Sequence, residues 1–143
     1  MLIRRMEEKD LDQVAELEKE IFSEPWSRND FAQELMADGH CYLVAEESGR
    51  VQGYCGYWGI AGEGQIYNVA VRQESRGQGL GRQLMERLLQ EGEAEGLQEF
   101  TLEVRAGNVS AIRLYHSVGF EDAGIRKNFY SKPVEDAIIM WRR

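Results

Sequence analysis

Three glycines at alternate positions form the segment of this sequence with the clearest chemical meaning. Gly77, Gly79 and Gly81 follow the apolar run IYNVAV and precede a helix with a leucine stripe. Glycine lets a ligand approach the backbone closely, and a helix N-terminus presents free N–H groups and a partial positive charge. A loop that merely needs positive φ angles is the alternative, but the strand and the helix on its two flanks favour a cradle for an anion.

The same segment excludes two common nucleotide-binding motifs. No Lys-Ser/Thr pair follows the last glycine, so the segment is not a P-loop. A dinucleotide fingerprint needs a third glycine three residues after G-x-G, and Arg82 and Leu84 occupy the two positions where it would fall. Nucleotide hydrolysis and hydride transfer are therefore disfavoured.

The hydrophobic periodicity predicts the elements that position this loop. Apolar residues at helical spacing predict a helix over residues 11–22 with Asp10 as its N-cap, and Ser27 with Asp30 predicts the start of a second, short helix. Residues 41–47 and 51–60 are rich in β-branched and aromatic side chains around the turn-forming Ser48-Gly49, which is typical of a hairpin. QIYNVAVR is expected to form one further strand.

The second half of the chain predicts a strand, helix, strand unit around the glycines. A leucine-striped helix over residues 80–92 leads to the strand FTLEVR, and a helix over residues 108–118 ends at Gly119. Two strands near residues 120–126 and 136–141 complete the order ααβββαβαββ, after a short first strand at residues 2–4. This order predicts an α/β (α+β) fold whose mixed sheet is antiparallel early and parallel across the helix.

Composition and charge limit the class of protein. The chain has 143 residues, is 43% hydrophobic and has a net charge of −8, which is typical of one domain spanning residues 1–143 and argues against nucleic-acid binding while allowing a basic substrate. No apolar run reaches the length of a membrane span and no signal peptide is evident, so we expect a cytoplasmic protein away from the membrane. Cys41 and Cys55 are expected to be reduced core thiols, and no metal site is predicted.

The loop Arg76-x-x-Gly79-x-Gly81 resembles the pyrophosphate-binding loop of the Gcn5-related N-acetyltransferase (GNAT) superfamily, which binds acetyl-CoA. The segments EIFSEPWS, IYNVAV, LEVRAGNVSAIRLYHSVGF and EDAIIM narrow the resemblance to the ribosomal-protein-alanine N-acetyltransferases of the RimI type, and together they extend over nearly the whole chain. Two positions depart from that pattern, because Gly107 stands where serine is common and Phe129 where tyrosine is common.

The resemblance implies a fold and a cofactor site. The fold would be GNAT-like, with a central mixed, mostly antiparallel sheet flanked by helices and a splay between two parallel strands at residues 68–71. Backbone at the splay would pair with the pantetheine arm and donate to the thioester oxygen. Asn108 would contact the cofactor while also acting as a helix N-cap. The implied cofactor-binding residues are Val69, Ala70, Val71, Arg76, Gly77, Gln78, Gly79, Leu80, Gly81, Arg82, Asn108 and Tyr115.

The resemblance also assigns two catalytic roles. Glu103 would be the general base that takes a proton from an α-amine, directly or through water, and Tyr115 would be the general acid that protonates the departing thiolate. Without the motif, Glu103 would more often be an edge glutamate paired with Arg105 or another cation. Tyr115 without its motif would more often be a packing residue, and the two histidines are interpreted as structural or solvated, with His40 in a loop.

The implied reaction is transfer of acetyl from acetyl-CoA to the N-terminal alanine of protein eighteen of the small ribosomal subunit, by direct attack in a ternary complex. The partner would thus be the basic N-terminal peptide of a ribosomal protein, and the enzyme a monomer or weak dimer. The residues expected to flank the acceptor groove, each with an equally plausible packing or solvated role, are Trp26, Glu63, Tyr67, Tyr130 and Asp136.

Other readings of the same motifs stay open at this stage. A GNAT enzyme acting on other protein N-termini, on a lysine side chain or on a small amine would share the glycine loop and Tyr115. A noncatalytic acyl-CoA sensor could keep the loop but would not need Glu103 together with Tyr115, and a structural phosphate-binding protein is remoter still.

Overall fold

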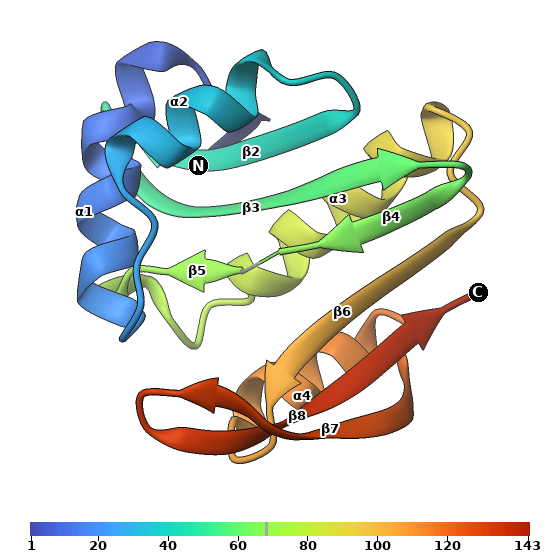
Figure 1. Cartoon of the computed structure of the whole chain (residues 1–143). Coiled ribbons are helices and arrows are strands. Elements are labelled where there is room, and N and C mark those ends of the chain that lie inside the picture. Colours follow the sequence, from blue (N-terminus) through green and yellow to red (C-terminus); the bar gives the residue numbers. More distant parts are fainter. Residues whose placement is uncertain (68) are drawn as a thin grey trace.

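The computed structural model describes residues 1–67 and 69–143 of the chain, which form one mixed sheet with helices on both faces (Figure 1). The strands follow the order β1-β2-β3-β4-β6-β8-β7, and β5 pairs separately with β3. Two short 3-10 turns lie at Glu8–Asp10 and Gln73–Ser75. The strands are β1 (Leu2–Arg5), β2 (His40–Glu47), β3 (Arg50–Ile60), β4 (Glu63–Ile66), β5 (Ala70–Val71), β6 (Glu99–Arg105), β7 (Glu121–Ser131) and β8 (Val134–Arg142). The helices are α1 (Leu11–Ile21), α2 (Arg28–Met36), α3 (Leu80–Ala94) and α4 (Val109–Ser117).

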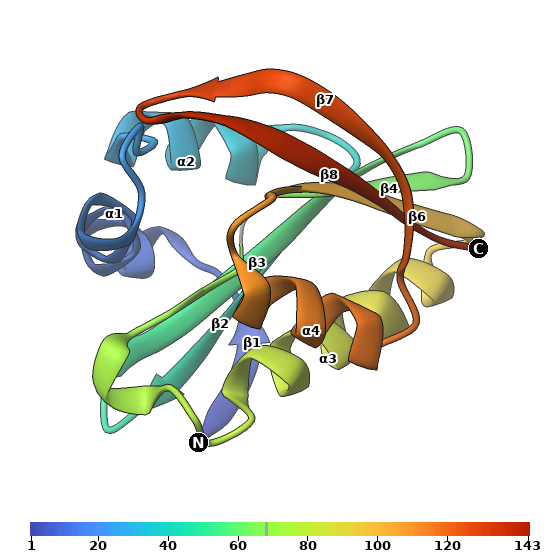
Figure 2. The same ribbon diagram turned by 90° about the horizontal axis from the view of Figure 1, so that it is seen from below.

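The alternation of side chains along β2 explains why both faces of the sheet are covered. Leu43 and Ala45 point to the side of α3 and α4, whereas Tyr42 and Val44 point to the side of α1 and α2. All four are buried, so β2 reads as a continuous apolar run rather than an alternating one. Figure 2 shows the two pairs of helices on opposite sides of the sheet.

The parallel strands β4 and β6 pair over only three residues. The pairs run from Glu63 with Glu99 to Gln65 with Thr101, after which the two strands separate. Beyond this point β6 continues beside β8 as far as Arg105, while β5 stays with β3. The sheet is therefore splayed open between its two halves, and Figure 1 shows β2 to β5 on one side of the opening and β6 to β8 on the other.

The expected single strand QIYNVAVR is wrong in one respect, because the structure divides it into β4 and β5. Ile66 pairs with Tyr57 and Ala70 with Tyr54, so four steps along this segment correspond to three steps along β3. One extra residue of this kind makes a β-bulge, which bends a strand and changes which way its backbone faces. Asn68, which we placed in the splayed strand, lies outside the described residues.

Helix ends agree with the sequence in most cases. Ser27 accepts from the Asp30 N–H at 3.1 Å and Asp30 accepts from the Ser27 N–H at 2.9 Å, which confirms the capping box of α2. Gly119, with φ of 100°, follows the end of α4 as expected. Asp10 precedes α1 but does not cap it, because its carboxylate instead binds the Arg4 guanidinium and the Glu7 N–H.

The cysteines and histidines are placed as follows. Cys41 and Cys55 are free thiols buried in the core on the α3 side, as expected. His40 begins β2 rather than lying in a loop, and its ring contacts the Glu34 carboxylate. His116 is half-exposed and pairs with Asp122 at 2.7 Å, which agrees with a structural or solvated role.

Candidate active site

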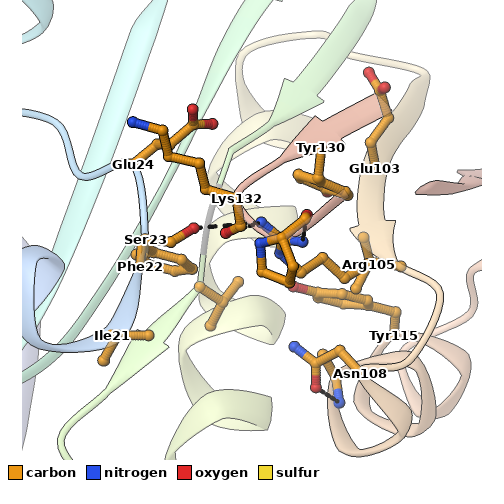
Figure 3. A pocket seen from close by; sticks show the side chains of 14 residues that line it. Ile21, Phe22, Ser23, Glu24, Glu103, Arg105, Asn108, Tyr115, Tyr130 and Lys132 are labelled. Carbon is orange, nitrogen blue, oxygen red and sulfur yellow. Dashed lines mark hydrogen bonds between the residues drawn. The ribbon is translucent and has the colours of Figure 1, made fainter. Parts of the chain in front are cut away.

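A cavity of about 400 Å³ opens where β4 and β6 separate (Figure 3). Its walls come from the end of α1 and the loop after it, from β6, from the start of α4 and from the hairpin between β7 and β8. The cavity thus joins segments from both ends of the sequence. The lining residues are Ile21, Phe22, Ser23, Glu24, Val69, Glu103, Val104, Arg105, Asn108, Ala111, Tyr115, Tyr130, Lys132 and Pro133.

The glycine loop at the start of α3 has the geometry of an anion cradle. Gly77 and Gly79 have φ of 79° and 77°, a conformation that favours glycine, and a Cβ at either position would meet nothing within 4 Å. Gly79 is also the N-cap, so it offers no side chain to the free N–H groups of the first helical turn. Arg76 donates from Nε to the Val71 carbonyl at 3.0 Å, which ties the loop to β5. These features fit the pyrophosphate of a CoA-type cofactor.

Asn108 joins the cofactor side of the cavity to α4. Its Oδ1 accepts from the Ala111 N–H at 3.2 Å, which makes it the N-cap of that helix. Asn108 and Ala111 both line the cavity, together with Val69 from the opposite side of the splay. The N-cap role that we expected for Asn108 is confirmed, and its position suits the expected contact with the cofactor.

Tyr115 projects from α4 into the cavity, from the side of the sheet that α3 and α4 cover (Figure 3). The residue is only 6% exposed and packs edge-on against Phe120 at 6.1 Å between ring centroids. Burial raises the pKa of the Tyr115 hydroxyl well above its ordinary value, and the charges that Tyr130 and Cys55 can carry raise it further. The hydroxyl is therefore protonated at neutral pH and is able to donate a proton.

Glu103 lies on the other face of β6, because Leu102 and Val104 on either side of it point into the core. Its Oε2 is 3.4 Å from Nε of Arg126 on β7, so its partner is a cation of the neighbouring hairpin rather than Arg105. Figure 3 shows the Glu103 carboxylate at the rim of the cavity, directed away from Tyr115. The base and acid candidates therefore face the cavity from opposite sides of one strand.

Of the five residues expected to flank the acceptor groove, Tyr130 lines the cavity. Trp26, in the loop between α1 and α2, and Tyr67, just after β4, belong instead to an aromatic cluster. Their ring centroids are 5.3 Å apart. Glu63 begins β4, at the far end of that strand from the splay, and Asp136 accepts from the Asn128 N–H at 2.9 Å within the hairpin. Neither of these two carboxylates lines the cavity.

Several lining residues were given no role in the site from the sequence. Ser23 and Glu24 on one wall lie in the EIFSEPWS segment, which carried the resemblance but no assigned role for them, and Lys132 and Pro133 on the other wall lie in a turn that shows no motif of its own. Arg105 was considered only as a partner for Glu103, yet it pairs with Glu135, 30 residues away. Proximity of this kind depends on the antiparallel register of β6 and β8, which no local pattern encodes.

Glu18 of α1 is an ionisable group buried beside the site. The residue is 1% exposed, and its carboxylate accepts from the Trp26 N–H at 2.9 Å and from the Tyr54 hydroxyl. Burial raises the pKa of Glu18 to about 7, although the Trp26 N–H opposes that effect. This carboxyl fixes the loop that leads from the cavity to Trp26.

In residues 1–67 and 69–143, no group of three or more His, Cys, Asp and Glu side chains is arranged to hold a metal ion. None of the helices described above is long and apolar enough to cross a membrane.

Comparison with known proteins agrees with the loop and the splay. The family model described as "Acetyltransferase (GNAT) family" matches residues 11–120, which is most of the chain. The chain belongs to the GNAT acetyltransferase family. It is therefore an acyltransferase that uses acetyl-CoA, and the glycine loop at the start of α3 is the segment whose geometry fits that cofactor.

Individual relatives are similar over nearly their whole lengths. An Escherichia coli K12 protein named [ribosomal protein bS18]-alanine N-acetyltransferase is 37% identical over 142 residues, covering 96% of this chain and 94% of the relative. The crystal structure of the Escherichia coli ribosomal-protein-S18-alanine N-acetyltransferase matches with a TM-score of 0.89 at 35% identity, over 99% of this chain and 92% of that one. A Salmonella typhimurium protein, solved with acetyl-CoA as its cofactor, matches with a TM-score of 0.85 at 25% identity. The match covers 100% of this chain and 93% of that one. The GNAT expectation is confirmed.

Replacing Gly79 with alanine should weaken acetyl-CoA binding by more than tenfold, because a Cβ there strains the left-handed backbone that aims the first N–H groups of α3. Calorimetric titration with acetyl-CoA measures this change. Gly49→Ala is the matched control, since Gly49 has φ of 79° and open space around it but lies in the turn between β2 and β3. Equal affinity in the two variants would place the cradle elsewhere.

Replacing Glu18 with glutamine should flatten the pH dependence of stability. The pKa of Glu18 is raised from 4.5 to about 7, so the folded chain holds this proton more tightly, and the parent loses stability as the pH rises through that window. Each pKa unit is worth about 1.4 kcal/mol, which makes the expected loss about 3 kcal/mol across the whole window from pH 4.5 to 7.

Unfolding by denaturant at pH 5, 6, 7 and 8 measures the effect of Glu18→Gln as a difference in slope against pH. Glu16→Gln changes an exposed carboxylate on the same helix and serves as the control, with the slope of the parent. If Glu18→Gln showed the same dependence of unfolding free energy on pH as the parent, the raised pKa of Glu18 would be wrong.

Proposed function

We propose that this chain acetylates the α-amine of the N-terminal alanine of ribosomal protein bS18. The observation that carries the proposal is the similarity to the Escherichia coli enzyme of that name, which extends over 96% of this chain at 37% identity. The cavity supports it, because a candidate proton acceptor and a candidate proton donor, Glu103 and Tyr115, line the same space.

The charge of the chain as a whole suits a basic acceptor peptide. The net charge is −8, although the cavity lining itself balances Glu24 and Glu103 against Arg105 and Lys132. An acidic surface draws a basic chain towards it and repels acidic competitors. Tyr130 and Glu103 line the same cavity, so a peptide N-terminus bound there lies within reach of both side chains.

Acetyl-CoA supplies the acetyl group as an activated thioester. The α-amine of a peptide is mostly protonated at neutral pH, so attack on the thioester requires that a proton be removed first. The carboxylate of Glu103 accepts this proton, directly or through a water molecule. The Tyr115 hydroxyl, whose pKa burial keeps high, holds its proton until it can be given to the departing thiolate.

A panel of acceptor peptides tests the function. The parent enzyme, acetyl-CoA and peptides that start with the bS18 N-terminus or with a different first residue are incubated, and mass spectrometry locates the acetyl group. Peptides whose basic residues are replaced by neutral ones test the role of charge. We expect acetylation at the α-amine of the alanine peptide, whereas acetylation of lysine side chains alone would refute the proposal.

Glu103→Gln should lower kcat/KM at pH 7 by about 10²-fold or more, with the defect shrinking towards pH 9.5. The reason is that an α-amine has a pKa near 7.7 to 8.0 and needs less help to lose its proton at high pH. The ratio of variant to parent kcat/KM, measured on the alanine peptide at each pH, reports this change.

The control for Glu103→Gln is Glu99→Gln, because Glu99 is also on β6 and also faces an arginine, Arg143, at 3.8 Å. This variant should match the parent at every pH. A Glu103→Gln ratio that is flat with pH would exclude a base that acts on an α-amine.

Tyr115→Phe should reduce kcat by about 10²- to 10⁴-fold while acetyl-CoA affinity changes little, because the lost proton matters as charge develops on the sulfur. Steady-state kinetics together with calorimetry separate the two effects. Tyr57→Phe removes another buried hydroxyl from the same core and should leave kcat within a few-fold of the parent. Near-parental kcat in Tyr115→Phe would make Tyr115 a packing residue.

A further inference from the structure

Arg105 occupies the centre of the acceptor side of the cavity, where β6 ends (Figure 3). Its Nη1 donates to the Pro133 carbonyl at 3.0 Å and to Glu135 at 3.2 Å. Its Nη2 donates to the Lys132 carbonyl at 3.1 Å and to the Ser23 hydroxyl at 3.3 Å. A guanidinium has five N–H donors, and these contacts engage four of them, so the group is committed to the protein rather than to a substrate.

The ring of Tyr130 gives Arg105 a further contact. The guanidinium carbon lies 4.2 Å from the centroid of that ring, which is within the range of a cation–π interaction. Because the guanidinium is planar, it can stack on the ring while its edges donate to the groups around it. Tyr130 is thereby held against the cavity by a side chain from a different strand.

The contacts of Arg105 bridge two segments that the splay leaves apart. Ser23 lies in the loop between α1 and α2, and Lys132 and Pro133 lie in the turn between β7 and β8. A second bridge runs beside it, where the Ser131 hydroxyl donates to Glu24 at 2.9 Å. Arg105 and the Ser131 hydroxyl therefore both join the two walls of the acceptor side.

Arg105 also connects the acceptor side to the cofactor side. Glu135, which it holds through Oε1, accepts from the Gly107 N–H at 2.6 Å through Oε2. A Cβ at position 107 would stand 2.7 Å from that oxygen, so a larger residue there would require the Glu135 carboxylate to shift. The next residue is Asn108, which caps α4 and lines the cavity.

We propose that Arg105 is a positioning residue that sets the width of the acceptor side of the cavity by clamping the α1–α2 loop to the β7–β8 hairpin. It acts through Ser23, Tyr130 and the Lys132–Pro133 backbone and touches neither reacting group. The effect on a peptide acceptor rests on the proposed function, but the clamp itself is a property of the free protein.

The test compares Arg105→Lys and Arg105→Met with the parent. Lysine keeps the charge but offers one ammonium in place of a planar guanidinium. It can therefore make only some of the hydrogen bonds that Arg105 makes to the two walls. We expect KM for the peptide to rise at least fivefold in Arg105→Lys and further in Arg105→Met, with acetyl-CoA affinity within twofold of the parent.

Two other variants keep the inference falsifiable if Arg105→Met folds poorly. Ser23→Ala removes only the loop end of the clamp and should raise the peptide KM about twofold. Arg143→Met is the matched control, since Arg143 also stacks on an aromatic ring, Trp141 at 4.3 Å, and also faces a glutamate, but follows β8 directly, away from the cavity lining. It should leave every measurement unchanged.

Hydrogen exchange on the free proteins gives a readout that does not depend on the acceptor. Arg105→Lys should speed amide exchange in residues 22–26 and 130–134 while α3 exchanges as in the parent. Unchanged exchange in both segments, or a loss of kcat and cofactor affinity without a change in peptide KM, would overturn the clamp. If the parent acetylates no peptide, the proposed function fails and the exchange result alone decides this inference.

Discussion

The early end of pairing between β4 and β6 is the constraint on which the site depends. Three residue pairs hold the parallel strands together, and past Gln65 and Thr101 each strand keeps only its other neighbour. Backbone groups that leave a sheet must find other partners, and here the opening is wide enough to form a cavity of about 400 Å³. The base candidate, the acid candidate and the acceptor walls all line this cavity.

The alternation of side chains along β6 places the base candidate and the acid candidate on different sides of that strand. Val104 points towards α4 and the buried Tyr115, whereas Glu103 and Arg105 point to the acceptor side. The candidate base and the candidate acid thus reach one cavity from opposite sides of a single strand. Their environments differ accordingly, because burial raises the pKa of Tyr115 while Glu103 stays at the rim beside Arg126.

The sequence predicts well those features that depend on neighbours along the chain. The glycine loop, the capping box at Ser27 and the end of α4 at Gly119 are local, and the structure has all three. The break between β4 and β5 was missed, because it shows only as an offset between the pairing of Ile66 and that of Ala70 with β3. An apolar run such as QIYNVAVR carries no sign of such an offset.

The acceptor side could not be predicted because its contacts are long-range. Arg105 meets Ser23 across 82 positions and Glu135 across 30, and only the folded sheet brings these residues together. Gly107 is instructive, since on sequence alone it is a minor departure from a position where serine is common. In the structure the space that a serine Cβ would need is filled by the Glu135 carboxylate, 2.7 Å away. The departure therefore goes with the Arg105–Glu135 ion pair between β6 and β8, because a side chain at position 107 would require the Glu135 carboxylate to move from the Gly107 N–H.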